Sequence, residues 1–162
     1  SYQNINTNEL AKIVEELLPG ADNYIINPAG EWSVGGFNAD SGTVGRKLSI
    51  DNYGPRVRIG GGAFSGKDLS KTDRSGAYFA RHLAVNILKQ TNANEVEVEL
   101  AFAIGVAEPV ARNIIVRDGS STYHLPKNLS PREYIQELDL SKVRFADVCQ
   151  WGHFGHQFPW EK

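Results

Sequence analysis

The chain has 162 residues, of which 41% are hydrophobic and 22% are charged, as is typical of one globular domain or of a large piece of a bigger protein. Its formal net charge of −2 argues against a general nucleic-acid binder, which needs a strong basic excess. No apolar run approaches the roughly 20 residues that span a membrane, no signal peptide is recognisable, and the one cysteine, Cys149, excludes a disulfide framework or cysteine-rich zinc site within the chain. We therefore expect a cytoplasmic protein.

The first 35 residues are expected to form a helix followed by short strands. Capping residues at 6–9 precede apolar side chains at positions 10, 13, 14 and 17, which share one helical face. Pro19–Gly20 ends this helix. Tyr24–Ile26 is then predicted to be a short strand, and Trp32–Val34 a second one.

Residues 35–73 are rich in glycine, and only 46–50 and 56–59 resemble strands. Long irregular segments in compact proteins are usually functional or disordered, and this one carries many charges. Arg46, Lys47, Lys67 and Lys71 supply cations, and Asp40, Asp68 and Asp73 supply carboxylates. Several cations around exposed backbone N–H groups suit a polyphosphate, and a carboxylate among them suits Mg²⁺. A solvated loop with ordinary ion pairs is the simpler interpretation for any single lysine, but not for the whole set.

Residues 60–68 read GGGAFSGKD, in which Gly61, Gly66 and Lys67 fit the G-x-x-x-x-G-K opening of a P-loop. A P-loop needs Ser or Thr after the lysine and leads directly into its helix. Here Asp68 follows Lys67, and the next expected helix begins only beyond Asp73. We therefore reject the P-loop interpretation.

A long helix over 74–89, capped by Asp73, is predicted from apolar side chains at 80, 83, 84, 87 and 88. Residues 95–100 alternate between charged and apolar side chains, which indicates a strand with one buried face. Residues 102–106 are expected to continue that strand, and 113–116 to return as another.

A short helix is expected to begin at Ser130–Pro131 and to end near Leu138. The predicted fold class is therefore α+β, with amphipathic helices packed on one face of antiparallel sheets.

The C-terminal tail contains His153 and His156 between glycine and proline residues. Histidines three residues apart can share a metal on a helix, but Gly155 and Pro159 argue against a helix here, so we expect structural roles. Cys149 is expected to be a small buried hydrophobic residue rather than a nucleophile. Trp32 alone could be a core aromatic or a stacking surface for a base.

Several motifs occur in an order and at a spacing that are familiar from one enzyme family. They are the segments 35–47, 60–67, 71–75, 103–106 and 152–155, which include GGGAFSGK, KTDRS and GHFG. Together they closely resemble the C-terminal part of S-adenosylmethionine synthetase (methionine adenosyltransferase), over nearly the whole chain. GGGAFSGKD is itself a signature of that family.

The resemblance implies a fold of three similar domains that are interleaved along the chain. Residues 1–35 would belong to one domain, 36–74 would be the polyphosphate-binding segment of the central domain, and 75–162 would form the C-terminal domain. It also implies the reaction: the sulfur of L-methionine attacks C5′ of ATP and displaces triphosphate, which is hydrolysed to pyrophosphate and phosphate. Such a displacement depends on positioning and on neutralising the departing polyanion.

The resemblance assigns ATP-binding and catalytic roles by position. Arg46, Lys47 and Lys67 resemble the triphosphate-binding residues, and Ala63 resembles a backbone contact to ATP. Asp40 is similar to the aspartate that contacts both the nucleoside and methionine. Arg46, Lys47, Lys67 and Asp40 are therefore the expected catalytic set.

The remaining assignments concern adenine, methionine and metal ions. Glu31 and Trp32 stand where the family has Arg and Phe beside adenine. Lys71 and Ile104 fall where the family contacts methionine, and Asp73 resembles a magnesium ligand. The resemblance implies Mg²⁺ and K⁺ as cofactors, with the K⁺ site mainly outside this sequence.

The family's N-terminal HPDK-type motif is not in this sequence, and no methionine occurs in it, even at position 1. We therefore expect one half of a split or processed enzyme that is active only in a hetero-oligomer with a second polypeptide. That polypeptide would supply the N-terminal half, and the active sites would lie between subunits. The alternatives are a non-catalytic regulatory subunit that binds nucleotide or S-adenosylmethionine, and a fragment of a full-length enzyme.

Overall fold

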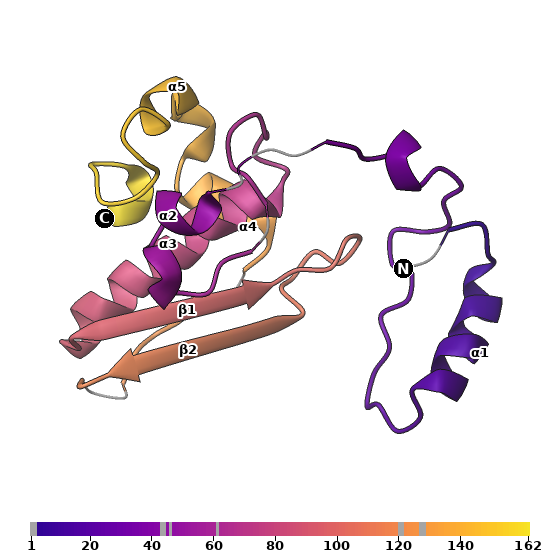
Figure 1. The fold of residues 1–162 in the computed structure, drawn as a ribbon. Helices are drawn as coiled ribbons and strands as arrows, with labels where there is room; N and C mark the ends of the chain where they lie inside the picture. Colours follow the sequence, from indigo (N-terminus) through magenta and orange to yellow (C-terminus); the bar gives the residue numbers. More distant parts are fainter. Residues whose placement is uncertain (1–2, 43–44, 46, 61, 120–121, 127–128) are drawn as a thin grey trace.

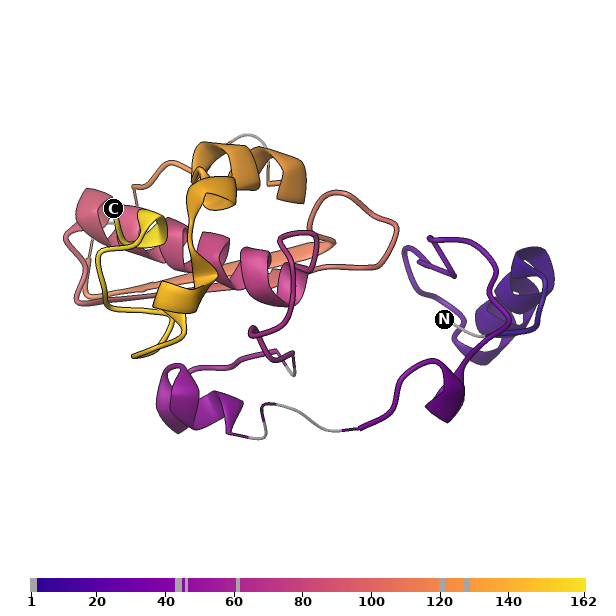
Figure 2. The same cartoon turned by 90° about the horizontal axis from the view of Figure 1, so that it is seen from above.

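The computed structural model describes residues 3–42, 45, 47–60, 62–119, 122–126 and 129–162. Figures 1 and 2 show a small N-terminal part around helix α1 and a larger part built on helix α3 and strands β1 and β2. The two parts approach each other at Gly105, where an added Cβ would lie 2.6 Å from the backbone of Pro28. Within the described residues, no helix combines the length and apolar character needed to cross a membrane.

Helix α1, Thr7–Leu17, begins and ends where the sequence predicts. The side chain of its N-cap residue, Asn6, accepts a hydrogen bond from the backbone N–H of Asn8, which satisfies one of the free donors of the first turn. Only Leu10 of this helix is buried, whereas Leu17 is 73% exposed. The apolar face of α1 is therefore largely uncovered.

The strands predicted at 24–26 and 32–34 are absent, because both segments lack secondary structure. A strand needs a neighbouring strand for its backbone hydrogen bonds, and the described residues offer no ladder partner there. The second segment instead lies against the chain before α1: Asn4 N–H donates to the Trp32 carbonyl at 3.0 Å.

The strand predicted at 46–50 is also wrong over its described residues, since helix α2 spans Leu48–Asp51; residue 46 lies outside the described part of the chain. The 3₁₀ helix η1 covers Gly36–Asn38 and η2 covers Gly54–Arg56, and 57–59 are irregular, so the strand predicted at 56–59 is not formed.

Helix α3, Thr72–Thr91, is the central element of the fold. It starts two residues before the predicted 74–89 and ends two residues after it. Lys71 is its N-cap, so Asp73 lies within the first turn and is not the cap. Its carboxylate still favours this end of the helix, because the N-terminus carries a partial positive charge. Asn92 ends the helix in the left-handed conformation, with φ of 52°.

Strands β1, Glu95–Ala101, and β2, Ala111–Arg117, pair antiparallel from Glu95↔Arg117 to Ala101↔Ala111. Both confirm sequence predictions. The expected continuation of β1 over 102–106 is wrong, because the ladder closes where Val110 N–H donates to the Ala101 carbonyl at 2.8 Å.

The core forms where α3 meets β1 on one side and the C-terminal segments on the other (Figure 1). Helix α4, Pro131–Glu137, begins as predicted, with a capping box between Ser130 and Glu133. The 3₁₀ helices η3, Leu140–Lys142, and η4, Pro159–Glu161, flank helix α5, Phe145–Val148. The largest fully buried side chains are those of Trp160, Tyr78, Tyr134, Phe79 and Ile87. The α+β class is confirmed.

Cys149 is exposed, which contradicts the expectation that it is buried. Its neighbour Val148, at the end of α5, is fully buried instead. The thiol lies 3.4 Å from the Ala146 carbonyl, one turn back, so the turn that directs Val148 inward directs Cys149 outward.

Candidate active site

The segment 64–71 forms two consecutive turns that lead into the N-terminus of α3. Lys67 N–H donates to the Phe64 carbonyl, and Lys71 N–H donates to that of Asp68, both at 3.2 Å. Gly66 has φ of 83°, a conformation that suits glycine in particular. Hydrogen bonds from the Ser70 side chain and backbone lower the pKa of Asp68, so this carboxylate stabilises the turn.

Lys67 and Asp73 are brought together at the end of this segment. The Lys67 Nζ atom lies 2.6 Å from Asp73 Oδ2. The two side chains are 29% and 50% exposed, so a ligand can reach both groups. A predicted triphosphate cation and the predicted metal ligand are therefore neighbours.

Two glycines allow the 60–67 loop to lie close to its surroundings. A Cβ on Gly62 would lie 2.2 Å from Asp73 Cγ, and a Cβ on Gly45 would lie 2.7 Å from Ala63 Cβ. The loop therefore contacts Asp73 on one side and Gly45 on the other. Arg46 itself lies outside the described residues.

The other predicted residues are more dispersed. Lys71 is exposed, with Nζ 3.1 Å from Ser70 Oγ, and Lys47 is exposed just before α2. Ile104 is 84% exposed in the loop between β1 and β2. Asp40 is exposed in the N-terminal part, where its N–H donates to the Gly36 carbonyl.

Glu31 and Trp32 also lie in the N-terminal part. A carboxylate oxygen of Glu31 accepts a hydrogen bond from Thr7 N–H at 3.0 Å, and Trp32 is 41% exposed. Among the described residues, no hydrogen bond or ion pair connects Asp40, Glu31 or Trp32 with the Lys67–Asp73 pair. The structure thus brings together only part of the predicted set.

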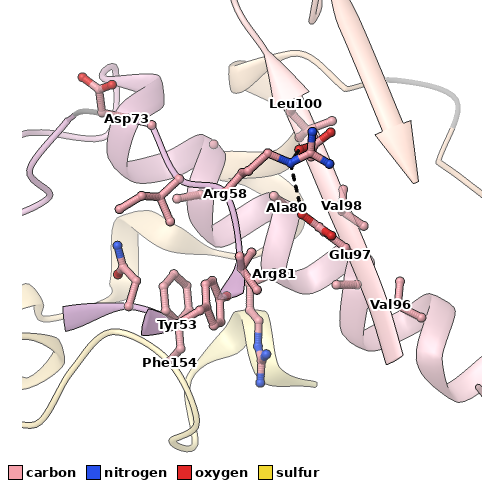
Figure 3. Close-up of a pocket in the computed structure, with 18 of the residues that line it drawn as sticks. Tyr53, Arg58, Asp73, Ala80, Arg81, Val96, Glu97, Val98, Leu100 and Phe154 are labelled. Atoms are coloured by element: carbon pink, nitrogen blue, oxygen red, sulfur yellow. Dashed lines mark ion pairs between the residues drawn. The ribbon is translucent and has the colours of Figure 1, made fainter. Parts of the chain in front are cut away.

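A cavity of about 720 Å³ extends from Asp73 along α3, between the 52–62 segment and β1. Figure 3 shows its apolar wall, formed by Ala80 of α3 and by Val96, Val98 and Leu100 of β1. Charged and aromatic side chains complete the lining, among them Arg58, Arg81, Glu97, Tyr53 and Phe154. Arg58 Nε pairs with Glu99 at 2.7 Å and lies 3.7 Å from Glu97. Burial raises the pKa of Tyr53 to about 12.

Arg74 and Tyr78 are buried residues of α3 next to the site. The sequence did not single them out as site residues. Arg74 is 4% exposed, and its Nη1 donates to the Lys67 carbonyl at 2.8 Å. Its Nε donates to the Tyr78 hydroxyl at 3.1 Å. An arginine four residues before a tyrosine on one helix is a detectable pattern, but the backbone partner at Lys67 is visible only in the structure.

The two histidines of the tail make hydrogen bonds within the protein, in agreement with the structural roles expected for them. His153 Nδ1 lies 2.8 Å from the Tyr78 hydroxyl, and the His153 carbonyl accepts from Trp160 Nε1 at 2.8 Å. His156 Nε2 lies 3.1 Å from the Trp151 carbonyl. Across the described part of the chain, no three His, Cys, Asp or Glu side chains are grouped so that they could hold a metal ion.

Comparison with known protein families shows to which family the chain is similar. The family model described as S-adenosylmethionine synthetase, C-terminal domain, matches residues 34–162. The chain belongs to the S-adenosylmethionine synthetase family.

Individual members of the family agree in sequence and in fold. The chain is 40% identical over 179 residues to S-adenosylmethionine synthase from Streptococcus suis, covering 100% of this chain and 45% of that protein. It is 43% identical to the synthase from Thermus thermophilus, covering 91% of this chain and 40% of that protein. An unusual S-adenosylmethionine synthetase from Campylobacter jejuni superposes with a TM-score of 0.66 at 31% identity, over 99% of this chain and 48% of that one.

The chain thus spans less than half the length of the S-adenosylmethionine synthetases that it matches.

Proposed function

We propose that this chain is a subunit of a methionine adenosyltransferase, which makes S-adenosylmethionine from ATP and L-methionine and releases phosphate and pyrophosphate. The observation that carries the proposal is the Lys67–Asp73 pair, 2.6 Å apart beside a glycine loop, in a member of this family. A cation and a carboxylate side by side suit a polyphosphate and the metal ion that accompanies it.

In this proposal the cations act on the departing triphosphate. Lys67, Lys47 and Arg46 would neutralise its charge, and the backbone at Ala63 would contact ATP. No acid or base is required of these residues, because positioning and charge neutralisation lower the barrier of such a displacement. Lys67 is well suited because a buried neighbour, Arg74, holds its carbonyl.

Asp73 would hold Mg²⁺. Its carboxylate is half exposed and supplies the hard oxygen ligand that Mg²⁺ prefers, and one or two carboxylates together with substrate phosphates are the usual protein site for this ion. Gly62 leaves the space beside that carboxylate free of a side chain. When bound, the ion would supply further positive charge to the triphosphate. The K⁺ site would lie in the part of the family's length that this sequence does not span.

The nucleoside and methionine would be bound from other segments. Glu31, Trp32 and Asp40 would contact the nucleoside, and Asp40, Lys71 and Ile104 would contact methionine. The close approach of Gly105 to Pro28 supports this division, because it places the loop that carries Ile104 next to the N-terminal part.

A second polypeptide would complete the enzyme as a hetero-oligomer with active sites between subunits. Relatives are more than twice as long as the matched region, and two features suit a partner. The apolar face of α1 is exposed at Ile13 and Leu17. The two-stranded sheet leaves each strand with one edge that has no ladder partner among the described residues, and β1 borders the 720 Å³ cavity.

Substitution of Lys67 tests the catalytic role. In the assembled enzyme, Lys67→Ala is expected to lower the rate of S-adenosylmethionine formation by about 10²-fold or more, because a charge-stabilising donor is lost. Lys89→Ala, which removes an exposed lysine from the last turn of α3, is the matched control and should leave the rate unchanged. An unchanged rate in Lys67→Ala would contradict the proposal and would favour a regulatory subunit that binds nucleotide or S-adenosylmethionine without catalysing the reaction.

A further inference from the structure

We infer that Arg74, Tyr78 and His153 form a positioning relay that fixes the polyphosphate loop at Lys67 to the C-terminal tail. The inference rests on the proposed function, since it concerns how that site is held. The three residues are joined to each other and to the loop by consecutive hydrogen bonds of 2.8, 3.1 and 2.8 Å.

The environment of Arg74 is unusual for a buried cation. Its guanidinium lies 3.9 Å from the centroid of the Phe145 ring and donates to the Lys67 carbonyl and the Tyr78 hydroxyl. No carboxylate within the described residues pairs with it. A buried charge without a counter-ion is costly, and this one contacts the backbone of a loop that would face a polyanion. Its field therefore adds to that of Lys67.

Tyr78 connects Arg74 with the C-terminal tail through its hydroxyl group. The ring is fully buried and stacks on Trp160, with centroids 3.9 Å apart and planes inclined by 3°. Its oxygen accepts from Arg74 Nε and lies 2.8 Å from His153 Nδ1, so the same hydroxyl joins the two side chains. Burial raises the pKa of Tyr78, so that the proton stays on the hydroxyl.

His153 of the tail contacts the loop in turn, through the side chain of Phe64. Its ring contacts the Phe64 ring edge-on, with centroids 4.9 Å apart, and Phe64 is the residue whose carbonyl accepts from Lys67 N–H. The contacts thus form a closed circuit from Lys67 through Arg74, Tyr78, His153 and Phe64 back to Lys67. A loop that is held in this way loses little freedom when it binds a ligand, which favours binding.

Binding of Mg²⁺–tripolyphosphate, measured by titration calorimetry on the full chain in the assembly that it forms, tests the relay. Tyr78→Phe removes only the hydroxyl that joins Arg74 to His153. Arg74→Lys keeps the charge but cannot contact the carbonyl, the hydroxyl and the ring at once. Each is expected to weaken tripolyphosphate binding by about tenfold.

Thr91→Val is the matched control. Thr91 is 3% exposed on the same helix, and its hydroxyl donates to the Ile87 carbonyl at 2.8 Å, so the variant also loses one buried hydroxyl, but far from the loop. It is expected to lower the melting temperature as Tyr78→Phe does, without changing the affinity for tripolyphosphate.

The outcomes separate the relay from the function on which it rests. If Tyr78→Phe and Arg74→Lys bind tripolyphosphate as tightly as the unaltered protein while Lys67→Ala does not, the relay is wrong and the proposed function stands. Equal weakening in Thr91→Val would also overturn the relay, since general stability would then explain the effect. If Lys67→Ala binds as tightly as the unaltered protein, the proposed function fails and the relay fails with it.

Discussion

At the scale of single residues, Gly62 determines how closely the glycine loop approaches the predicted metal ligand. An added Cβ would lie 2.2 Å from Asp73 Cγ, a separation that packed atoms cannot adopt. Either the carboxylate or the loop would have to move. Gly60, two residues earlier, offers a direct contrast, because no atom lies within 4 Å of an added Cβ there.

Gly62→Ala is therefore expected to weaken Mg²⁺-dependent binding of polyphosphate by about tenfold or more, by displacing Asp73 from Lys67. Gly60→Ala, as the matched variant, should bind almost as the unaltered protein does. The measurement is the Mg²⁺ concentration that half-saturates tripolyphosphate binding. Equal behaviour of the two variants would show that the contact between Gly62 and Asp73 has no role in the site.

The sequence predicts Lys67 and Asp73 as site residues, because their charges stand among glycines in a recognisable motif, and these roles stay predictions. Their direct pairing at 2.6 Å was not predicted, and neither was the position of Arg74. The environment of Arg74 depends on a carbonyl one turn before the helix and on an aromatic ring of the tail. Such contacts are set by packing, which a linear pattern does not contain.

At the scale of secondary-structure elements, the helices were predicted better than the strands. Helices α1, α3 and α4 carry their own signals in caps and apolar spacing, and β1 with β2 could be predicted from alternation and from a nearby return segment. Among the described residues, the strands predicted at 24–26, 32–34, 46–50 and 56–59 are absent. Strands depend on distant partners, so a β-prone segment without a partner stays irregular or, as at α2, becomes helical.

Helix α1 provides an element-scale prediction, because it is 11 residues long and buries only Leu10. Isolated helices of this length are marginal in water. In the chain alone, the amides of α1 are expected to exchange with solvent at least about 10²-fold faster than those of α3, which has eight buried residues between Arg74 and Thr91. Hydrogen exchange read by mass spectrometry measures both helices in one sample.

Addition of a polypeptide that corresponds to the N-terminal half of the family should slow exchange in α1 and leave α3 nearly unchanged. If the amides of α1 are already as protected from exchange as those of α3 in the chain alone, the apolar face of α1 is not a binding surface for the second polypeptide.

At the scale of the whole molecule, family and fold class could be predicted because five motifs recur in order, and the family model confirms that reading over residues 34–162. The division into segments 1–35, 36–74 and 75–162 stays a prediction. The roles of the site residues also stay predictions: Lys67, Asp73, Ala63, Arg46, Lys47, Asp40, Glu31, Trp32, Lys71 and Ile104. The large cavity beside β1 could not be predicted from the sequence, because it arises between segments far apart in the chain.

The central claim is that this chain supplies the polyphosphate part of a methionine adenosyltransferase and that a second polypeptide supplies the rest. The most direct test is the formation of S-adenosylmethionine from ATP and L-methionine with Mg²⁺ and K⁺ present. Three samples should be assayed. They are the verified 162-residue chain alone, a polypeptide corresponding to the N-terminal half of the family alone, and the mixture of the two. The account predicts product only when both chains are mixed. Robust product formation by the 162-residue chain alone would contradict it.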